Sequence, residues 1–249
     1  MHYLITFARF LQTAAKAFAS KYKSLNQSYT RMLNELEDEK LLQKFEQIAD
    51  RLSDKGYAIV DNFLEPQEVR DLLNVLTHHQ EQGTFKKAGI GSADQFTVDK
   101  EVRGDFIRWI EPSEALPPTR VFLDRMDEVM RYINRTCFLG LKDYEFHFTV
   151  YPPGTVYQRH IDQFKENDHR RLSFICYLNE DWLPEHGGNL RLYLPQEDGS
   201  EEEVDILPIA GRLACFRADL IPHEVLVATR HRYSLTGWML DQLNELTFL

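Results

Sequence analysis

The stretch YEFHFTVYPPGTVYQRHIDQF, residues 144–164, contains two alternating runs typical of β-strands, separated by the turn residues Pro-Pro-Gly. Six more short runs of this kind follow before the C-terminus, with turn signals such as Gly187-Gly188 and Asp198-Gly199 between them. Many short strands at such regular spacing predict a double-sheet barrel or jelly roll. The six later runs cover residues 171–179, 189–194, 202–209, 212–218, 223–229 and 232–240.

Helical patterns occupy most of the chain before these strands. Apolar residues share one helical face in the first pattern, which Gly56 ends, and Pro66 lies in the first turn of the second. A strand is expected between the first two helices, and a long loop rich in Gly, Ser and Asp after the second. The expected helices are 34–55, 65–83 and 117–138, the strand 57–64 and the loop 84–100.

The order of these elements predicts the fold class. Helices first and then many strands indicate an α+β fold in which N-terminal helices buttress a jelly-roll core. We expect residues 1–50 to form a helical extension and residues 51–249 to form the main domain.

Composition excludes several classes of protein. The 249 residues, 43% of them hydrophobic, suffice for one domain with a sizeable core. A net charge of −10 argues against a general nucleic-acid binder and favours a small molecule or a protein segment as partner. The widely spaced Cys137, Cys176 and Cys215 predict neither a disulfide framework nor a zinc site, and they favour a reducing, cytoplasmic compartment. No stretch approaches the roughly 18 apolar residues of a membrane span.

The first 34 residues allow two interpretations. Leu4, Phe7, Leu11, Ala14 and Phe18 recur at helical spacing, which favours an amphipathic helix docked on the main domain. The same segment carries five basic residues and no acid, as a transit peptide does.

His160 and Asp162 are candidate metal ligands at the end of the 156–164 run. Two residues at spacing two lie on one face of a strand, so both side chains can reach a shared ion. With 9 His and 18 Asp in the chain, about 0.65 such pairs are expected by chance, so a third ligand is required.

His223 is our choice for that third ligand. It begins a late strand, in the position from which a double-sheet barrel could return beside the first strand. His147 on the 144–152 run is kept in reserve as a core or cleft histidine. The other histidines considered fall on predicted surfaces or turns: His78, His79, His169, His186 and His231.

Arg232, nine residues after His223, is a candidate for binding an anion. It shares a strand face with Ser234, Thr236 and Trp238, and no carboxylate follows the same alternation. An arginine on the inner face needs an anionic partner, which a ligand carboxylate can provide bidentately. The alternative is that Arg232 points outward to solvent.

His160-x-Asp162, His223 and Arg232 together resemble the signature of the 2-oxoglutarate-dependent dioxygenases. The pattern is most similar to the prolyl hydroxylase branch that includes the hypoxia-inducible-factor prolyl hydroxylases and their bacterial relatives. The resemblance covers roughly residues 57–241, and its further motifs are EVRGDFIRWIEP at 101–112, YLNEDW at 177–182 and HGGNLRLYLP at 186–195.

The resemblance implies a double-stranded β-helix and a ferrous centre. His160, Asp162 and His223 would bind Fe(II), with 2-oxoglutarate and O2 as co-substrates and ascorbate as a candidate additional cofactor. The implied reaction is hydroxylation of a prolyl residue with release of succinate and CO2.

It also implies a set of co-substrate residues. Arg232 would pair with the distal carboxylate of 2-oxoglutarate, helped by the phenol of Tyr177. Tyr151 would form a hydrogen bond near the chelating end, and Thr236 and Trp238 would line the pocket.

The implied partner is a proline-containing protein, over which the 84–100 loop would close with the freedom of Gly89 and Gly91. Asp105 and Arg170 are candidates for the substrate rim, although we favour ordinary surface charges at both positions. Two other hypotheses stay open. One is the same chemistry on another residue or a small molecule, and the other is a non-catalytic, cupin-like binding module.

Overall fold

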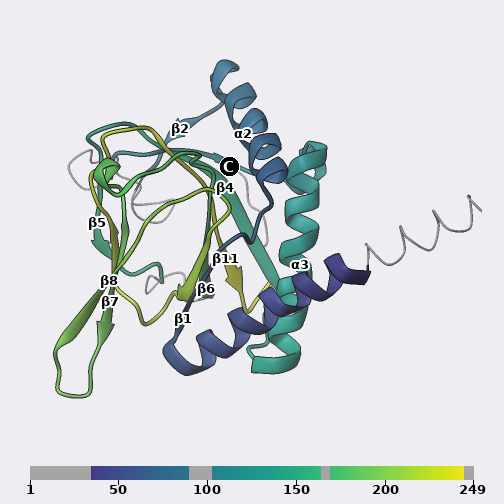
Figure 1. Cartoon of the computed structure of the whole chain (residues 1–249), viewed down its shortest axis with the longest axis vertical. Coiled ribbons are helices and arrows are strands. Elements are labelled where there is room, and N and C mark those ends of the chain that lie inside the picture. The colour runs from purple at the N-terminus through teal and green to yellow at the C-terminus, as the bar shows by residue number, and fades with distance from the viewer. Residues whose placement is uncertain (1–34, 90–102, 164–168, 244–249) are drawn as a thin grey trace, which may run out of the picture. The chain divides into compact units, whose positions relative to one another are not determined.

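The computed structural model describes residues 35–89, 103–163 and 169–243. The chain divides into two compact units, residues 1–44 and 45–249, and the second unit holds every strand of the described residues (Figure 1). The docked-helix and transit-peptide interpretations of the first 34 residues lie outside the described residues, as does most of the 84–100 loop. Within the described residues, no helix is both long and apolar enough to cross a membrane.

Two antiparallel sheets form the body of the second unit. The larger sheet has seven strands in the order β1-β9-β6-β11-β4-β3-β2, and the smaller has four in the order β5-β10-β7-β8. The strands of the larger sheet are β1 (Tyr57–Val60), β9 (Leu213–Arg217), β6 (Arg170–Tyr177), β11 (Arg232–Leu240), β4 (Asp143–Tyr151), β3 (Phe106–Trp109) and β2 (Lys86–Lys87). Those of the smaller sheet are β5 (Tyr157–His160), β10 (His223–Val225), β7 (Leu190–Pro195) and β8 (Glu201–Ile206).

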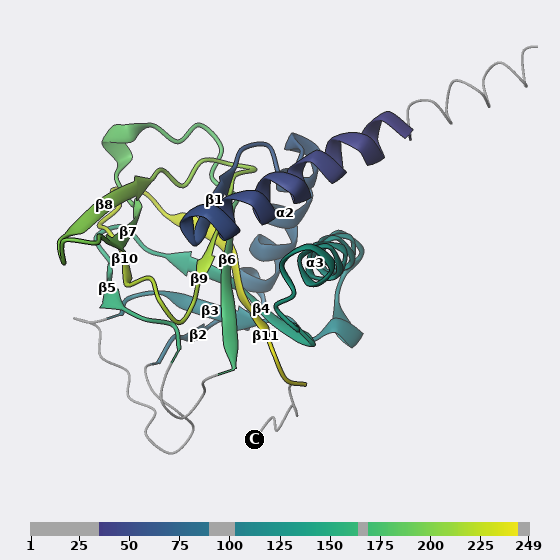
Figure 2. The ribbon, with the colours of Figure 1, turned by 90° about the horizontal axis from the view of Figure 1, so that it is seen from below.

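Helices cover the outer face of the larger sheet, where α2 (Pro66–Glu81) and α3 (Pro117–Cys137) lie side by side (Figures 1 and 2). Each begins with a proline, whose fixed φ suits the first turn. The ring of Phe122 on α3 packs edge-on against Phe146 of β4, with centroids 5.3 Å apart. Arg125 of α3 also pairs with Glu68 of α2. Residues 35–55 are also helical. The described residues include two short 3-10 helices as well, Pro112–Glu114 and Pro184–His186.

The core that positions the site lies between the two sheets (Figure 2). Alternate residues of each strand point into this space, as the period of two requires. The buried cluster draws from both sheets: Tyr151, Tyr157, Ile175, Tyr177, Leu190, Leu192, Ile206, Ala214, Phe216, Ile221 and Val225.

The predicted elements correspond to observed ones with shifted ends. All eight strands predicted after residue 143 are present, but the 223–229 run is a strand only over His223–Val225. The strand predicted for 57–64 ends at Val60, because the chain turns at Asn62, whose φ is 53°. Part of the predicted loop is also a strand, since Lys86 and Lys87 pair with β3.

Candidate metal centre and adjoining cavity

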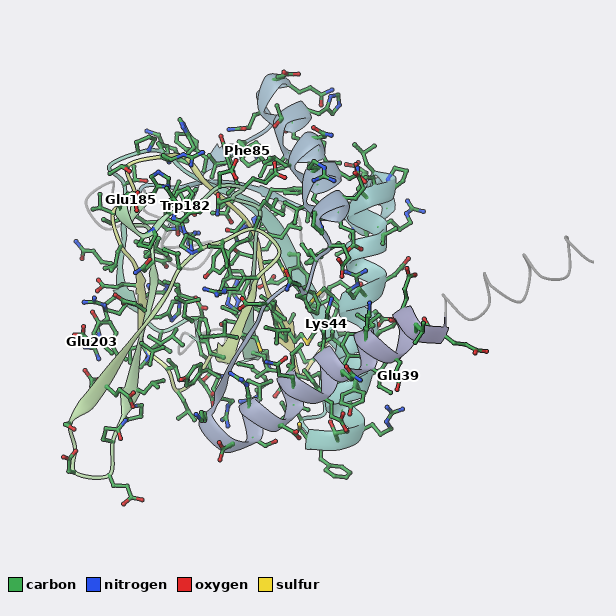
Figure 3. The ribbon with its side chains drawn as sticks, in the orientation of Figure 1. Glu39, Lys44, Phe85, Trp182, Glu185 and Glu203 are labelled. Atoms are coloured by element: carbon green, nitrogen blue, oxygen red, sulfur yellow. The ribbon has the colours of Figure 1, made fainter. Side chains whose placement is uncertain are left out.

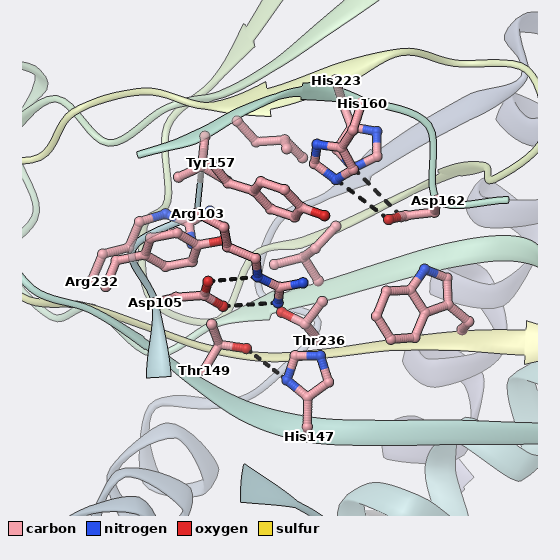
Figure 4. A pocket seen from close by; sticks show the side chains of 15 residues that line it. Arg103, Asp105, His147, Thr149, Tyr157, His160, Asp162, His223, Arg232 and Thr236 are labelled. Atoms are coloured by element: carbon pink, nitrogen blue, oxygen red, sulfur yellow. Dashed lines mark hydrogen bonds and ion pairs between the residues drawn. The ribbon is translucent and has the colours of Figure 1, made fainter. Parts of the chain in front are cut away.

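His160, Asp162 and His223 meet at one point between the sheets. Their potential ligand atoms all lie within 4.8 Å of one another. Asp162 Oδ1 is 3.5 Å from Nε2 of His160, and its Oδ2 is 3.4 Å from Nε2 of His223 (Figure 4). The pairing of β5 with β10 explains the meeting, because it places His160 directly opposite His223.

Both imidazole rings are oriented by backbone carbonyls. Nδ1 of His160 lies 2.7 Å from the oxygen of Gln158, and Nδ1 of His223 lies 3.2 Å from that of Ile221. A proton held on Nδ1 by such a bond leaves the Nε2 lone pair free for a metal. Both Nε2 atoms face Asp162, so the two rings and the carboxylate converge.

The protonation states also suit a divalent cation. Burial lowers the pKa of His223 to about 4, so its ring is neutral at pH 7. Burial opposes ionisation of Asp162, but the neighbouring histidines and a hydrogen bond from Ser173 hold its pKa well below the usual range. Metal ligands must be neutral imidazoles and ionised carboxylates. Two His and one carboxylate leave positions open on a ferrous ion, so these residues fit the metal that the sequence predicts.

Aromatic rings pack against the two histidines of the candidate metal centre. Tyr157 stacks on His160 with centroids 3.6 Å apart and an interplanar angle of 19°. The guanidinium carbon of Arg103 lies 4.5 Å from the centroid of the Tyr157 ring, and the ring centroids of Phe216 and His223 are 4.6 Å apart. These contacts restrict the imidazoles to their present orientations.

The three residues line a cavity of about 40 Å³ that continues to Arg232 (Figure 4). That volume holds roughly three water molecules.

Arg232 carries a buried charge that no acid of the described residues neutralises. Its residue surface is 2% exposed, and within the described residues no carboxylate lies at ion-pair distance from it. The alternative in which Arg232 points to solvent is wrong. The rings of Tyr151 and Tyr177 lie 5.1 and 5.0 Å from its guanidinium carbon. A carboxylate from a ligand would satisfy this cation.

Tyr177 adds a second unsatisfied group. Its hydroxyl is buried and has no hydrogen bond of acceptable geometry among the described residues. Burial raises the pKa of Tyr177 to about 12, so the hydroxyl keeps its proton and can donate to an anion. The Tyr177 ring contacts the guanidinium of Arg232, which lines the cavity, but Tyr177 is not among the lining residues.

The other predicted co-substrate residues all line the cavity. Tyr151 pairs in register with Arg232 across β4 and β11, and Thr236 lies beside Ser234 with 3.2 Å between their hydroxyl oxygens. The indole nitrogen of Trp238 is buried without a partner among the described residues. Arg170 stacks over that indole at 3.6 Å.

Asp105 and Arg170 are not ordinary surface charges. Asp105 is 1% exposed and forms a bidentate pair with Arg103 at 2.7 and 2.9 Å, because both side chains point into the same cavity. Arg170 pairs with Glu145 as well as stacking on Trp238. The spacing of two between Arg103 and Asp105 is the sequence signal that could have indicated a shared face.

His147 and Ser173 also lie next to the cavity or the candidate metal ligands. His147 lines the cavity, but it is not part of the metal-binding group and lies 2.9 Å from the hydroxyl of Thr149. Ser173 was not predicted to touch the centre, and it donates a 2.6 Å hydrogen bond to Asp162. Ser173 and Tyr177 are four residues apart on β6, so strand alternation places both on one face, which is the sequence signal for this contact.

Comparison with known proteins agrees with this site. The model of the 2OG-Fe(II) oxygenase superfamily matches residues 146–240. A crystal structure of a Pseudomonas putida prolyl-4-hydroxylase is 38% identical, with a TM-score of 0.71, over 80% of this chain and 100% of that one. The chain belongs to the 2OG-Fe(II) oxygenase superfamily, in its prolyl hydroxylase branch. The resemblance predicted from the motifs is thereby confirmed.

Other members of the prolyl hydroxylase branch are similar as well. A Trichoplax adhaerens prolyl hydroxylase, solved with a hypoxia-inducible-factor peptide fragment, has a TM-score of 0.74 and 28% identity over 83% of this chain and 93% of that one. The hypoxia-inducible factor prolyl hydroxylase of Caenorhabditis elegans is 30% identical over 79% of this chain and 28% of its own length. Egl nine homolog 1 of Homo sapiens is 31% identical over 79% of this chain and 46% of its own length. The chain thus spans about half or less of these two curated relatives.

Proposed function

We propose that this protein uses Fe(II), 2-oxoglutarate and O2 to hydroxylate a prolyl residue of another protein, releasing succinate and CO2. The observation that carries the proposal is that Arg232, buried and without an acidic partner among the described residues, lines the same cavity as the His160, Asp162 and His223 group. One cavity thus offers a metal-binding group and a receptor for a carboxylate. Membership of the prolyl hydroxylase branch supports the choice of substrate.

The fold and domain boundaries are part of the proposal. We infer that the two facing sheets form a double-stranded β-helix, which their antiparallel order and shared buried core support. Residues 51–249 would be the oxygenase domain and residues 1–50 its helical extension.

Each ligand-binding residue has a proposed role. His160, Asp162 and His223 hold the iron, and when bound the iron supplies the redox chemistry for which the protein provides binding and orientation. Arg232 and the hydroxyl of Tyr177 receive the distal carboxylate of 2-oxoglutarate.

Tyr151, Thr236 and Trp238 line the remaining wall, where they exclude water. Burial raises the pKa of Tyr151 well above its usual value, so this phenol also donates rather than ionises.

The rest of the account stays a prediction. A proline-containing protein as partner is supported by the peptide bound to the Trichoplax adhaerens enzyme. Closure of the 84–100 loop, ascorbate as a further cofactor and a cytoplasmic location rest on the sequence alone.

The substrate can be tested with an extract of the host cell. Purified protein with Fe(II) and 2-oxoglutarate should add the mass of one oxygen atom to a prolyl residue of an extract protein, detected by peptide mass spectrometry. His160→Ala should add none, and Glu203→Gln, on the exposed outer strand β8, should act as the wild type does.

The outcomes separate the alternatives. Oxygen added to another residue type, or to a free metabolite, would replace prolyl hydroxylation by the same chemistry on a different substrate. Failure to bind iron would support the non-catalytic binding module instead.

A further inference from the structure

A backbone carbonyl orients Arg232, which has no acidic partner in the part of the chain that the structure describes. Its Nε donates a 3.0 Å hydrogen bond to the oxygen of Gly188. A guanidinium has five N–H donors in a planar fork. Because Nε is engaged, the two terminal NH2 groups remain for a ligand. A carboxylate is therefore expected to bind end-on, through the two terminal NH2 groups of Arg232, and not side-on through Nε and one NH2 group.

Gly188 can present this carbonyl only as glycine. Its φ is +72°, and an added Cβ would lie 2.9 Å from Cβ of Ala228 and 3.4 Å from Cδ of Arg232. Its N–H donates to the oxygen of Val227 at 2.8 Å. The N–H of Gly188 is thus held by Val227, in the segment before β11, and its carbonyl oxygen is held by Arg232.

Trp182, in the connection between β6 and β7, contacts the same turn (labelled in Figure 3). Its indole Nε1 donates to the oxygen of Gly187 at 3.0 Å, and its ring lies 3.3 Å from where a Cβ on Gly188 would be. The ring is 6% exposed and packs edge-on against His186, with centroids 5.5 Å apart. Trp182 does not line the cavity, so any influence on a ligand passes through the glycine turn.

We propose that Trp182, Gly187 and Gly188 form a positioning unit that sets the orientation of Arg232 for a dicarboxylate ligand. Trp182 is then a positioning residue, which acts on affinity for the distal carboxylate and leaves the metal-chelating end untouched. This inference rests on the proposed binding of 2-oxoglutarate.

A pair of chelators tests the unit directly. Pyridine-2,4-dicarboxylate and pyridine-2-carboxylate present the same chelating face and differ in the distal carboxylate. Their binding to the Fe(II)-loaded protein would be measured by calorimetry without oxygen. Trp182→Phe, which removes the N–H and keeps a ring, should weaken binding of the dicarboxylate roughly three- to tenfold, as loss of one neutral hydrogen bond does. Binding of the monocarboxylate should not change.

Tyr144→Phe is the matched control. It also removes a ring-borne hydrogen bond to a backbone oxygen, that of Leu123, at a site that does not line the cavity. It should bind both chelators as the wild type does. If Trp182→Phe does not fold, the isosteric β-(3-benzothienyl)alanine at position 182 removes the N–H alone.

The results distinguish two failures. Equal weakening of both chelators, or weakening of neither, would overturn the positioning role of Trp182. A wild-type protein that binds neither chelator would overturn the proposed function itself.

Discussion

The hydroxyl of Ser173 on strand β6 donates a 2.6 Å hydrogen bond to Oδ2 of Asp162, the carboxylate that both histidines face. Removal of such a partner of a ligand typically lowers metal affinity roughly 10- to 100-fold. Ser173→Ala should therefore weaken Fe(II) binding by about that factor, measured by anaerobic competition with a chelating dye. Ser234→Ala removes another buried hydroxyl that contacts none of the three ligands. Equal metal affinities of the two variants would contradict the role given to Ser173.

The buried pair of Arg103 and Asp105 should contribute more to stability than its exposed counterpart on β7 and β8. Arg191 and Asp205 have the same bidentate distances, 2.7 and 2.9 Å, but lie at the surface. Asp105→Asn should lower the free energy of unfolding by about 3 kcal/mol, because it leaves a buried charge unpaired. Asp205→Asn should lower it by less than about 1 kcal/mol. Urea unfolding of the two variants measures the difference, and similar losses would show that burial does not matter here.

His147 should make the metal-free protein less stable as the pH falls. Burial, together with the positive charge of Arg103, lowers the pKa of His147 to about 3. The unfolded chain, with an ordinary histidine pKa, binds a proton at a higher pH than the folded chain does. The free energy of unfolding therefore decreases as the pH falls from the pKa of His147 in the unfolded chain towards its pKa in the folded chain.

Between about pH 7 and pH 5 this group should account for a loss of about 2 kcal/mol in the free energy of unfolding. His147→Gln should show a correspondingly smaller loss, by urea unfolding at the two pH values. His231→Gln, at an exposed position, should keep the full wild-type dependence. An unchanged pH dependence in His147→Gln would refute this assignment.

The buried charge of Arg232 should stabilise the complex with 2-oxoglutarate and should not stabilise the ligand-free protein. Replacing a buried charge by an apolar side chain of similar size is often neutral or stabilising. Arg232→Met should then unfold at the same temperature as the wild type or higher, and 2-oxoglutarate should no longer raise that temperature. Thermal unfolding with and without 2-oxoglutarate measures both effects. A strongly destabilised Arg232→Met would indicate that Arg232 is needed for folding.

Local patterns in the sequence predict much of the site. The period of two places Ser173 and Tyr177 on the face that points inward, and the same period places Thr236 and Trp238 beside Arg232. The His160-x-Asp162 pair and His223 were identified as candidates, and the structure brings them together.

Contacts between distant segments could not be predicted in this way. The burial of Asp105 depends on how β3 joins the larger sheet, which no local period specifies. The hydrogen bond from Arg232 to Gly188 spans 44 residues, and it depends on a backbone conformation that only the folded turn reveals.

Labelled oxygen tests the central claim most directly. The purified protein would be given Fe(II) and 2-oxoglutarate under ¹⁸O₂, and the succinate formed would be analysed by mass spectrometry. We predict succinate that carries one labelled oxygen atom, and none from His223→Ala or Arg232→Ala. Absence of succinate, or succinate without the label, would contradict the account.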